Sequence, residues 1–195
     1  QLMGIDPSDG FVESAKASVP SGDFRVGSAV ELDLPDRSLG LAVSGLGLNF
    51  GLDSGKVISK MARIVRPGET VASYVWDYAG QIWIMRYFFD SARKIDEAAS
   101  AFDDGVNASI CRPQPLTDAY NAAGLVDVET TAIDIQTPFV DFDDYWSPFL
   151  GGTGSAPRYC MSLDENTRNR IKIRSKQSCR LVRTARFYSR LGLGR

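Results

Sequence analysis

Two groups of residues near the start of the chain could hold a ligand. Asp6 follows a short apolar run, and Ser44 and Gly45 lie within the apolar run 39–50. In doubly wound sheets, ligands bind at the carboxyl ends of parallel strands, where a carboxylate can accept hydrogen bonds from both hydroxyls of a ribose. Small residues there let a ligand lie close against a strand. Asp6 could instead cap a helix over 7–17, so both interpretations of this carboxylate stay open.

The absence of histidine narrows the chemistry that the chain can perform. It excludes zinc sites built on imidazole, the Ser-His-Asp triad and a histidine base. Proton transfer would fall to Asp, Glu, Tyr or Lys. The three cysteines, Cys111, Cys160 and Cys179, are odd in number and widely spaced. This pattern is typical of reduced thiols rather than of a disulfide framework.

The stretch 139–157 combines acidic and aromatic residues at 141–149 with a glycine-rich run at 151–154. Such a stretch could hold a cationic or amine substrate by charge and cation-π contact. Its carboxylates match the spacing of no calcium loop, so we expect no metal site. The glycines are followed by no Gly-Lys-Ser/Thr and form no phosphate loop. We favour a simpler interpretation, an aspartate-capped helix over about 142–150 followed by a loop.

Apolar runs alternate with helical patterns through the first half of the chain. An apolar stripe at helical spacing indicates a helix over 53–65, and the following Arg66-Pro67-Gly68 ends it. A second helix is expected over 7–17. The stretches that predict strands are 1–5, 23–27, 39–50 and 70–76. This alternation predicts an α/β fold with a parallel sheet.

The second half of the chain continues the pattern less regularly. Residues 82–101 indicate an unusually aromatic helix, 115–123 a further helix and 126–135 a further strand. Aromatic residues at helical spacing most often pack in a core, and we interpret those of 82–101 in this way.

Six segments between residues 4 and 76 together resemble a known protein family. They are Gly4-Ile5-Asp6-Pro7-Ser8, Phe24 to Ala29, Leu34-Pro35-Asp36, Leu41 to Phe50, Ile64-Val65-Arg66-Pro67-Gly68 and Thr70 to Trp76. The set resembles the later half of a class I S-adenosylmethionine-dependent methyltransferase of the small-molecule type. The most specific segment is the helix end at residues 63–68, which is a structural motif. The resemblance covers about residues 2–135.

The resemblance implies a Rossmann-like three-layer fold and a site for S-adenosylmethionine. Asp6 and Pro7 would lie at the ribose. Ser44 and Gly45 would lie at the end of the strand predicted over 39–50, which corresponds to the fourth strand of the family. Ser28 and Ala29 would lie at the adenine, where the family usually has an acid in place of Ser28. A hydroxyl can still accept the hydrogen bond of the adenine amino group, though more weakly than a carboxylate.

The implied reaction is displacement of the sulfonium methyl group by a small-molecule acceptor. It depends mainly on alignment, so we assign no catalytic residue. One alternative is an NAD(P)-dependent Rossmann oxidoreductase, because Asp6 would serve a nicotinamide cofactor equally well. Another is a truncated methyltransferase copy that has no function.

Both ends of the chain depart from the family pattern. The first strand and the glycine-rich cofactor loop would precede Gln1, so we expect 1–167 to form a partial methyltransferase domain. Residues 168–195 contain ten Lys or Arg and no Asp or Glu. We interpret this basic tail as the product of a frameshift between about residues 170 and 183, with the last strand lost, and not as a nucleic-acid-binding surface.

Composition favours a globular protein. The apolar share is 44% and the charged share 24%, and no apolar run reaches the roughly 18 residues of a membrane span. No basic segment followed by an apolar one opens the chain as a secretory signal would. We expect a cytoplasmic protein with a small-molecule substrate and no membrane partner, and the sequence leaves the oligomeric state open.

Overall fold

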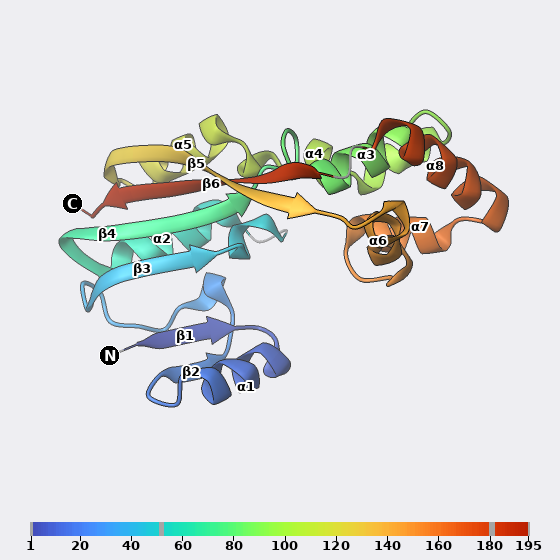
Figure 1. The fold of residues 1–195 in the computed structure, drawn as a ribbon. Coiled ribbons are helices and arrows are strands. Elements are labelled where there is room, and N and C mark those ends of the chain that lie inside the picture. Colours follow the sequence, from blue (N-terminus) through green and yellow to red (C-terminus); the bar gives the residue numbers. More distant parts are fainter. Residues whose placement is uncertain (1, 51–52, 180–181, 195) are drawn as a thin grey trace.

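A computed structural model describes residues 2–50, 53–179 and 182–194 (Figure 1). The strands are β1 (Met3–Asp6), β2 (Asp23–Val26), β3 (Leu39–Gly45), β4 (Val65–Trp76), β5 (Val126–Pro138) and β6 (Val182–Leu193). They form a two-stranded sheet, β1-β2, and a four-stranded sheet in the order β3-β4-β6-β5. The pairs β1-β2 and β3-β4 are parallel, and β1 to β4 all run in the same direction. Their carboxyl ends therefore lie on one side of the molecule.

The strand β6 corrects the expectation that the last strand is lost. Residues 182–193 run antiparallel between β4 and β5 and pair with both of them. The preceding helix, α8 (Glu165–Ser178), contains residue 168, at which we expected the tail to begin. A frameshift concerns the coding DNA and stays a prediction. In the fold, however, the tail contributes the strand that joins β5 to the rest of the sheet.

The longer helices follow local sequence signals. They are α1 (Asp9–Ser18), α2 (Ser54–Ile64), α3 (Trp83–Ala92), α5 (Pro113–Ala122), α7 (Ser155–Ser162) and α8; shorter ones are α4 (Asp104–Asn107) and α6 (Phe142–Trp146). Asp53 caps α2 by accepting a hydrogen bond from the Lys56 amide at 2.9 Å. The predicted apolar stripe of α2 is buried. Among the described residues, every helix is too short or too polar to cross a lipid bilayer.

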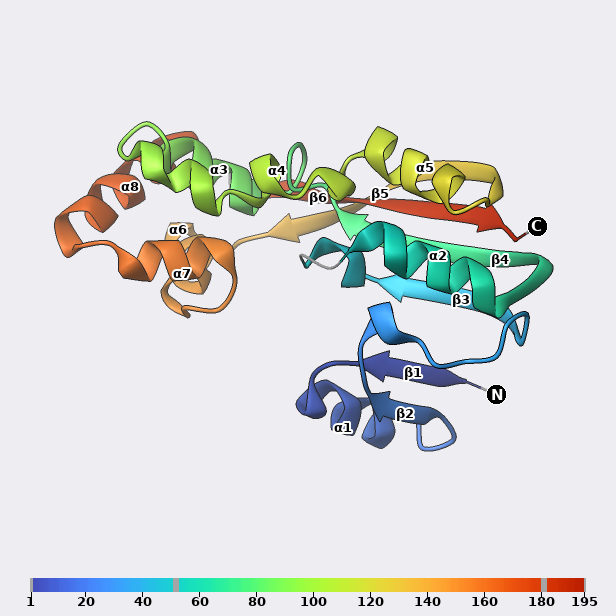
Figure 2. The same ribbon diagram turned by 180° about the vertical axis from the view of Figure 1, so that it is seen from behind.

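The two faces of the four-stranded sheet differ. Helices α2 and α5 pack on one face (Figure 2), where Ala42 and Val71 are buried. On the other face Leu41 and Val43 are 54% and 55% exposed, because alternate residues of a strand point to opposite sides. Within the described residues, β1 pairs only with β2 and β3 only with β4, so each keeps one unpaired edge.

Buried side chains form an aliphatic cluster between the sheet and its helices and an aromatic cluster among α3, α6, α7 and α8. In the aromatic cluster, Phe88 stacks on Phe149 at 4.5 Å between ring centroids. Phe88 and Phe89 of α3 are thus core, as we expected, whereas Trp83 and Tyr87 are only partly buried. That helix ends at Ala92, earlier than predicted, and a short 3-10 helix, η3 (Glu97–Phe102), follows it.

The stretch 139–157 follows the simpler interpretation. Asp141 caps α6 by accepting a hydrogen bond from the Asp144 amide at 2.8 Å. Asp143 forms an ion pair with Lys172 at 2.9 Å. Two of the carboxylates considered for a cationic substrate therefore bind protein groups instead.

Candidate active site

The carboxyl ends of β1 and β2 bring two of the sequence-predicted residues together. Asp6 and Val26 are register partners, and the Gly27 amide donates a hydrogen bond to the Asp6 carbonyl at 3.0 Å. Ser28 follows immediately and begins the 3-10 helix η1 (Ala29–Glu31). The two predicted pairs, Asp6-Pro7 and Ser28-Ala29, therefore occupy adjacent loops at one sheet edge.

Polar atoms in these loops already make local hydrogen bonds. Asp6 Oδ1 accepts from the Ser8 amide at 2.8 Å, and Ser28 Oγ accepts from the Val30 amide at 3.4 Å. The capping of α1 itself falls to Ser8, whose Oγ accepts from the Phe11 amide. Asp6 Oδ2 receives no hydrogen bond from the described residues, so this oxygen stays available to a ligand.

Ser44 and Gly45 are the last residues of β3, and Gly45 lies close to the Tyr74 side chain of the neighbouring strand β4. Gly45 is the register partner of Tyr74, and a Cβ atom at position 45 would lie 2.4 Å from the Tyr74 hydroxyl. A side chain at position 45 would therefore displace the Tyr74 ring from its place beside the backbone. Leu46 then adopts a left-handed conformation with φ of 56° and turns the chain into η2 (Gly47–Asn49).

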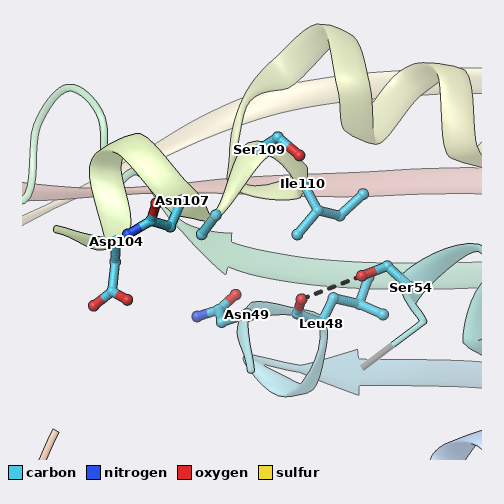
Figure 3. Close-up of a pocket in the computed structure, with 8 residues that line it drawn as sticks. Leu48, Asn49, Ser54, Asp104, Asn107, Ser109 and Ile110 are labelled. Atoms are coloured by element: carbon cyan, nitrogen blue, oxygen red, sulfur yellow. Dashed lines mark hydrogen bonds between the residues drawn. The ribbon is translucent and has the colours of Figure 1, made fainter. Parts of the chain in front are cut away.

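A cavity of about 330 Å³ lies beyond the end of β3 (Figure 3). One wall comes from η2 and the start of α2, and the other from α4 and the 3-10 helix η4 (Ser109–Cys111). The lining residues are Leu48, Asn49, Ser54, Asp104, Asn107, Ala108, Ser109 and Ile110. We call this cavity the η2–α4 pocket. It contains none of the six residues predicted from the sequence.

Asn49 is the buried polar side chain of this pocket, with 8% of its surface exposed. Its Oδ1 accepts a weak hydrogen bond from the Cys111 thiol at 3.6 Å. Its Nδ2 makes no hydrogen bond of normal geometry within the described part of the chain. Figure 3 shows the side chain extending from η2 into the space below α4.

Two neutral groups stand behind Asn49. Burial raises the pKa of Tyr78 to about 12, with Asp104 and Cys111 adding to the rise and the Asn49 amide opposing it. Burial likewise raises the pKa of the Cys111 thiol to about 12, with further contributions from Asp104 and Asp77. Both groups therefore keep their protons at neutral pH.

Carboxylates fix the loops around the pocket. Asp77 follows β4 and accepts hydrogen bonds from the Gly80 and Gln81 amides at 2.9 and 3.0 Å. The fully buried Asp103 pairs with Arg86 and Arg93. The Asp103 pairs hold the start of α4 against α3, because Arg86 lies in α3 and Asp103 precedes α4 directly.

Asp104 is different, since it forms no ion pair with a described Lys or Arg. Its Oδ2 accepts a hydrogen bond from the Ser155 hydroxyl at the start of α7. Its Oδ1 receives no hydrogen bond from the residues that the structure describes. The pocket lining also includes no Lys or Arg. Asn49 stood inside a predicted strand-and-loop segment, but no sequence signal pointed to Asp104.

Comparison with known proteins finds a family match in the first part of the chain. Residues 1–72 match the family described as a methyltransferase domain. This part of the chain is similar to that family. The match ends within β4 and includes the strand ends that hold Asp6, Ser28 and Ser44.

Relatives agree with this assignment over short stretches. Malonyl-[acyl-carrier protein] O-methyltransferase of Yersinia pestis is 27% identical over 88 residues, which cover 43% of this chain and 33% of that protein. The match thus spans about a third of that curated relative.

The fold agrees along the whole chain. YcgJ from Bacillus subtilis has a TM-score of 0.61 at 14% identity, covering 99% of this chain and 82% of that one. Phosphoethanolamine N-methyltransferase 2 of Haemonchus contortus, solved with S-adenosyl-L-methionine, has a TM-score of 0.58 at 12% identity, covering 100% of this chain and 43% of that one. The chain therefore shares the Rossmann-like α/β fold of these structures.

Proposed function

We propose that the protein transfers a methyl group from S-adenosylmethionine to a small-molecule acceptor. The observation that carries this proposal is the methyltransferase match over residues 1–72, within which Asp6 and Ser28 stand in adjacent loops at the carboxyl ends of β1 and β2. The match favours methyl transfer over the nicotinamide-dependent alternative. The relatives named above methylate oxygen in one case and nitrogen in the other, so the acceptor must be argued from this chain's own pocket.

The residues at the strand ends fit this cofactor. Asp6 Oδ2 is available to ribose hydroxyls, and Ser28 can accept a hydrogen bond from an adenine amino group. Pro7 and Ala29 accompany them in the same two loops. Ser44 and Gly45 present little side chain at the end of β3, where a ligand could approach the backbone. When bound, the cofactor supplies an electrophilic methyl group.

The chain's own contribution is to position the acceptor and to exclude water. The Tyr78 phenol and the Cys111 thiol are neutral at pH 7, since burial raises the pKa of each to about 12. Neither group therefore serves as a general base at that pH. We assign no catalytic residue, because displacement at a methyl group gains most of its acceleration from alignment.

We further propose a cytoplasmic setting without a nucleic-acid partner. Cysteine usage supports this, because Cys111 and Cys160 are buried thiols that form no disulfide with a described residue, and free thiols are typical of a reducing compartment.

Calorimetric titration with S-adenosylhomocysteine tests the proposal. We expect saturable binding by the native chain and binding about 10-fold weaker, roughly 1.4 kcal/mol, in Asp6→Ala. Asp118→Asn, a change at an exposed carboxylate of α5, is the matched control and should bind as the native chain does. A folded native chain that gives no saturable heat would show that it holds no cofactor, as the alternative of a non-functional copy requires.

A further inference from the structure

The η2–α4 pocket contains two polar groups whose hydrogen-bonding capacity is only partly satisfied by the described residues. One is the Asn49 amide on the β3 side, and the other is the Asp104 carboxylate on the α4 side. Figure 3 shows the two side chains facing the same space from opposite walls. A single small molecule could therefore meet both.

The Asn49 amide would favour a ligand with a hydrogen-bond acceptor. An amide nitrogen carries two N–H donors. At most one of them faces the Tyr78 phenol, whose pKa burial raises and the Asn49 amide lowers. Nδ2 nevertheless makes no hydrogen bond of normal geometry among the described residues, although the residue is only 8% exposed. An unsatisfied buried donor costs about 1–3 kcal/mol, which a bound acceptor atom would recover.

The Asp104 carboxylate would favour a ligand with a cationic donor. The neighbouring guanidinium groups are engaged elsewhere, since Arg86 pairs with Asp103 and Arg93 with Asp90 and Asp103. Arg112 donates to the Gly105 carbonyl at 2.9 Å. Within the described chain, the Asp104 carboxylate accepts a hydrogen bond only from the neutral Ser155 hydroxyl. The carboxylate thus faces the pocket without a cation from the described residues.

The other polar groups reinforce this preference. Burial raises the pKa of Cys111, and the negative charges of Asp104 and Asp77 raise it further. Asp104 is also the one charged side chain among the described residues that line the pocket. A negative potential attracts cations and repels carboxylates and phosphates. The cavity volume of about 330 Å³ lies at the lower end of the range for small-molecule sites.

We propose that the η2–α4 pocket binds a small organic ammonium compound, with the ammonium group at Asp104 and an acceptor atom at Asn49. That this compound is the methyl acceptor rests on the function proposed above. Binding itself needs no cofactor, so the pocket can be tested separately from methyl transfer.

The test compares benzylamine with benzyl alcohol and benzoate, which share a ring and differ in charge. Each compound is titrated into the native chain, with binding followed by NMR shifts of the Asn49 side-chain amide. We expect benzylamine to bind at least about 10-fold more tightly than benzyl alcohol, and benzoate not to bind. Equal affinity for the three compounds would overturn the proposal.

Variants assign the preference to Asp104. Asp104→Asn should bind benzylamine and benzyl alcohol equally, whereas Asp118→Asn should keep the native preference. Ser155→Ala keeps the Asp104 charge and removes its hydrogen-bond donor, so it should keep the preference as well. If Asp104→Asn folds and still prefers the amine, Asp104 is not the group that selects it. Loss of the preference in Ser155→Ala with an intact fold would equally exclude selection by the carboxylate's charge.

Saturating S-adenosylhomocysteine separates this pocket from the cofactor site. We expect the benzylamine affinity to change by less than about 2-fold. Displacement of benzylamine would mean that the pocket belongs to the cofactor, and the proposal would be wrong. Amine binding by a chain that binds no S-adenosylhomocysteine would contradict the proposed function and leave the ammonium site standing.

Discussion

The ends of β1 and β2 and the η2–α4 pocket lie at the carboxyl ends of parallel strands, but they are built differently. At β1 and β2, Asp6 and Ser28 bind amides only two residues away. In the pocket, Asn49 meets Cys111 across 62 residues and Asp104 meets Ser155 across 51. The first region can be read from a local sequence pattern, whereas the second exists only once distant segments have packed.

The largest difference in stability between the two regions should come from removing the buried Asp103 carboxylate beside the pocket. Asp103 is fully buried and pairs with Arg86 and Arg93, so Asp103→Ala leaves a buried guanidinium without its partner. We expect a loss of about 3–5 kcal/mol in the free energy of unfolding, measured by urea titration. Asp118→Asn should leave this free energy within about 0.5 kcal/mol of the native value. A similarly small loss in Asp103→Ala would mean that the pocket wall does not depend on this pair.

The second-largest effect should be a loss of stability at alkaline pH, caused by the buried groups beside the pocket. The folded-state pKa of Cys111 is raised to about 12, whereas an ordinary thiol has a pKa of 9.0. The folded chain keeps a proton that the unfolded chain releases, so this stabilisation is intact below about pH 9 and is lost as the pH rises toward 12. The slope is at most about 1.4 kcal/mol per pH unit for this group. Burial likewise raises the pKa of Tyr78, from 10.0 to about 12, so its contribution to stability is lost as the pH rises above about 10.

Urea unfolding between pH 8 and 10 measures this slope. Cys111→Ala should flatten it, because the thiol is then absent from both states. Burial also raises the pKa of Cys160, to about 11, so Cys160→Ala provides a comparison from outside the pocket. Identical slopes in the native chain and Cys111→Ala would contradict the raised pKa of Cys111.

The smallest effect should be a change in cofactor affinity caused by a substitution at the ends of β1 and β2. Ser28→Asp supplies a charged acceptor for an adenine amino group and can still cap η1, since aspartate is a good N-cap residue. We expect S-adenosylhomocysteine to bind a few-fold more tightly, because charged hydrogen bonds are stronger than neutral ones. Ser38→Asp, at an exposed serine outside the site, controls for added charge. Weaker binding in Ser28→Asp would place the adenine elsewhere.

Much of the fold could be predicted because its signals are local. The stripe of α2, its Asp53 cap and the Asp141 cap of α6 each depend on residues within one or two turns. The end of the aromatic helix was placed too late because Asp96 starts η3 by accepting a hydrogen bond from the Ala98 amide. Strand β6 was missed because its basic residues resemble no buried strand, and its place depends on pairing with β4 and β5.

The candidate site divides in the same way. Asp6 and Ser28 follow predicted strands and Gly45 lies within the predicted segment 39–50, and the resemblance to the methyltransferase family implied a role for each of them. No sequence signal indicated Asp104, which reaches the pocket only because Arg86 and Ser155 hold the segments around it. A local pattern cannot report a contact between residues 51 positions apart.

The central position of β6 also has a consequence for the order of folding. β4 and β5 share no hydrogen bonds with each other, since β6 lies between them. β5 therefore cannot join the sheet until residues 182–193 have been synthesised and have reached β4. Such long-range pairing slows folding, because a long loop must close before its contacts form. During synthesis, β5 therefore has no partner in this sheet until β6 follows it, and β6 then completes the four-stranded sheet.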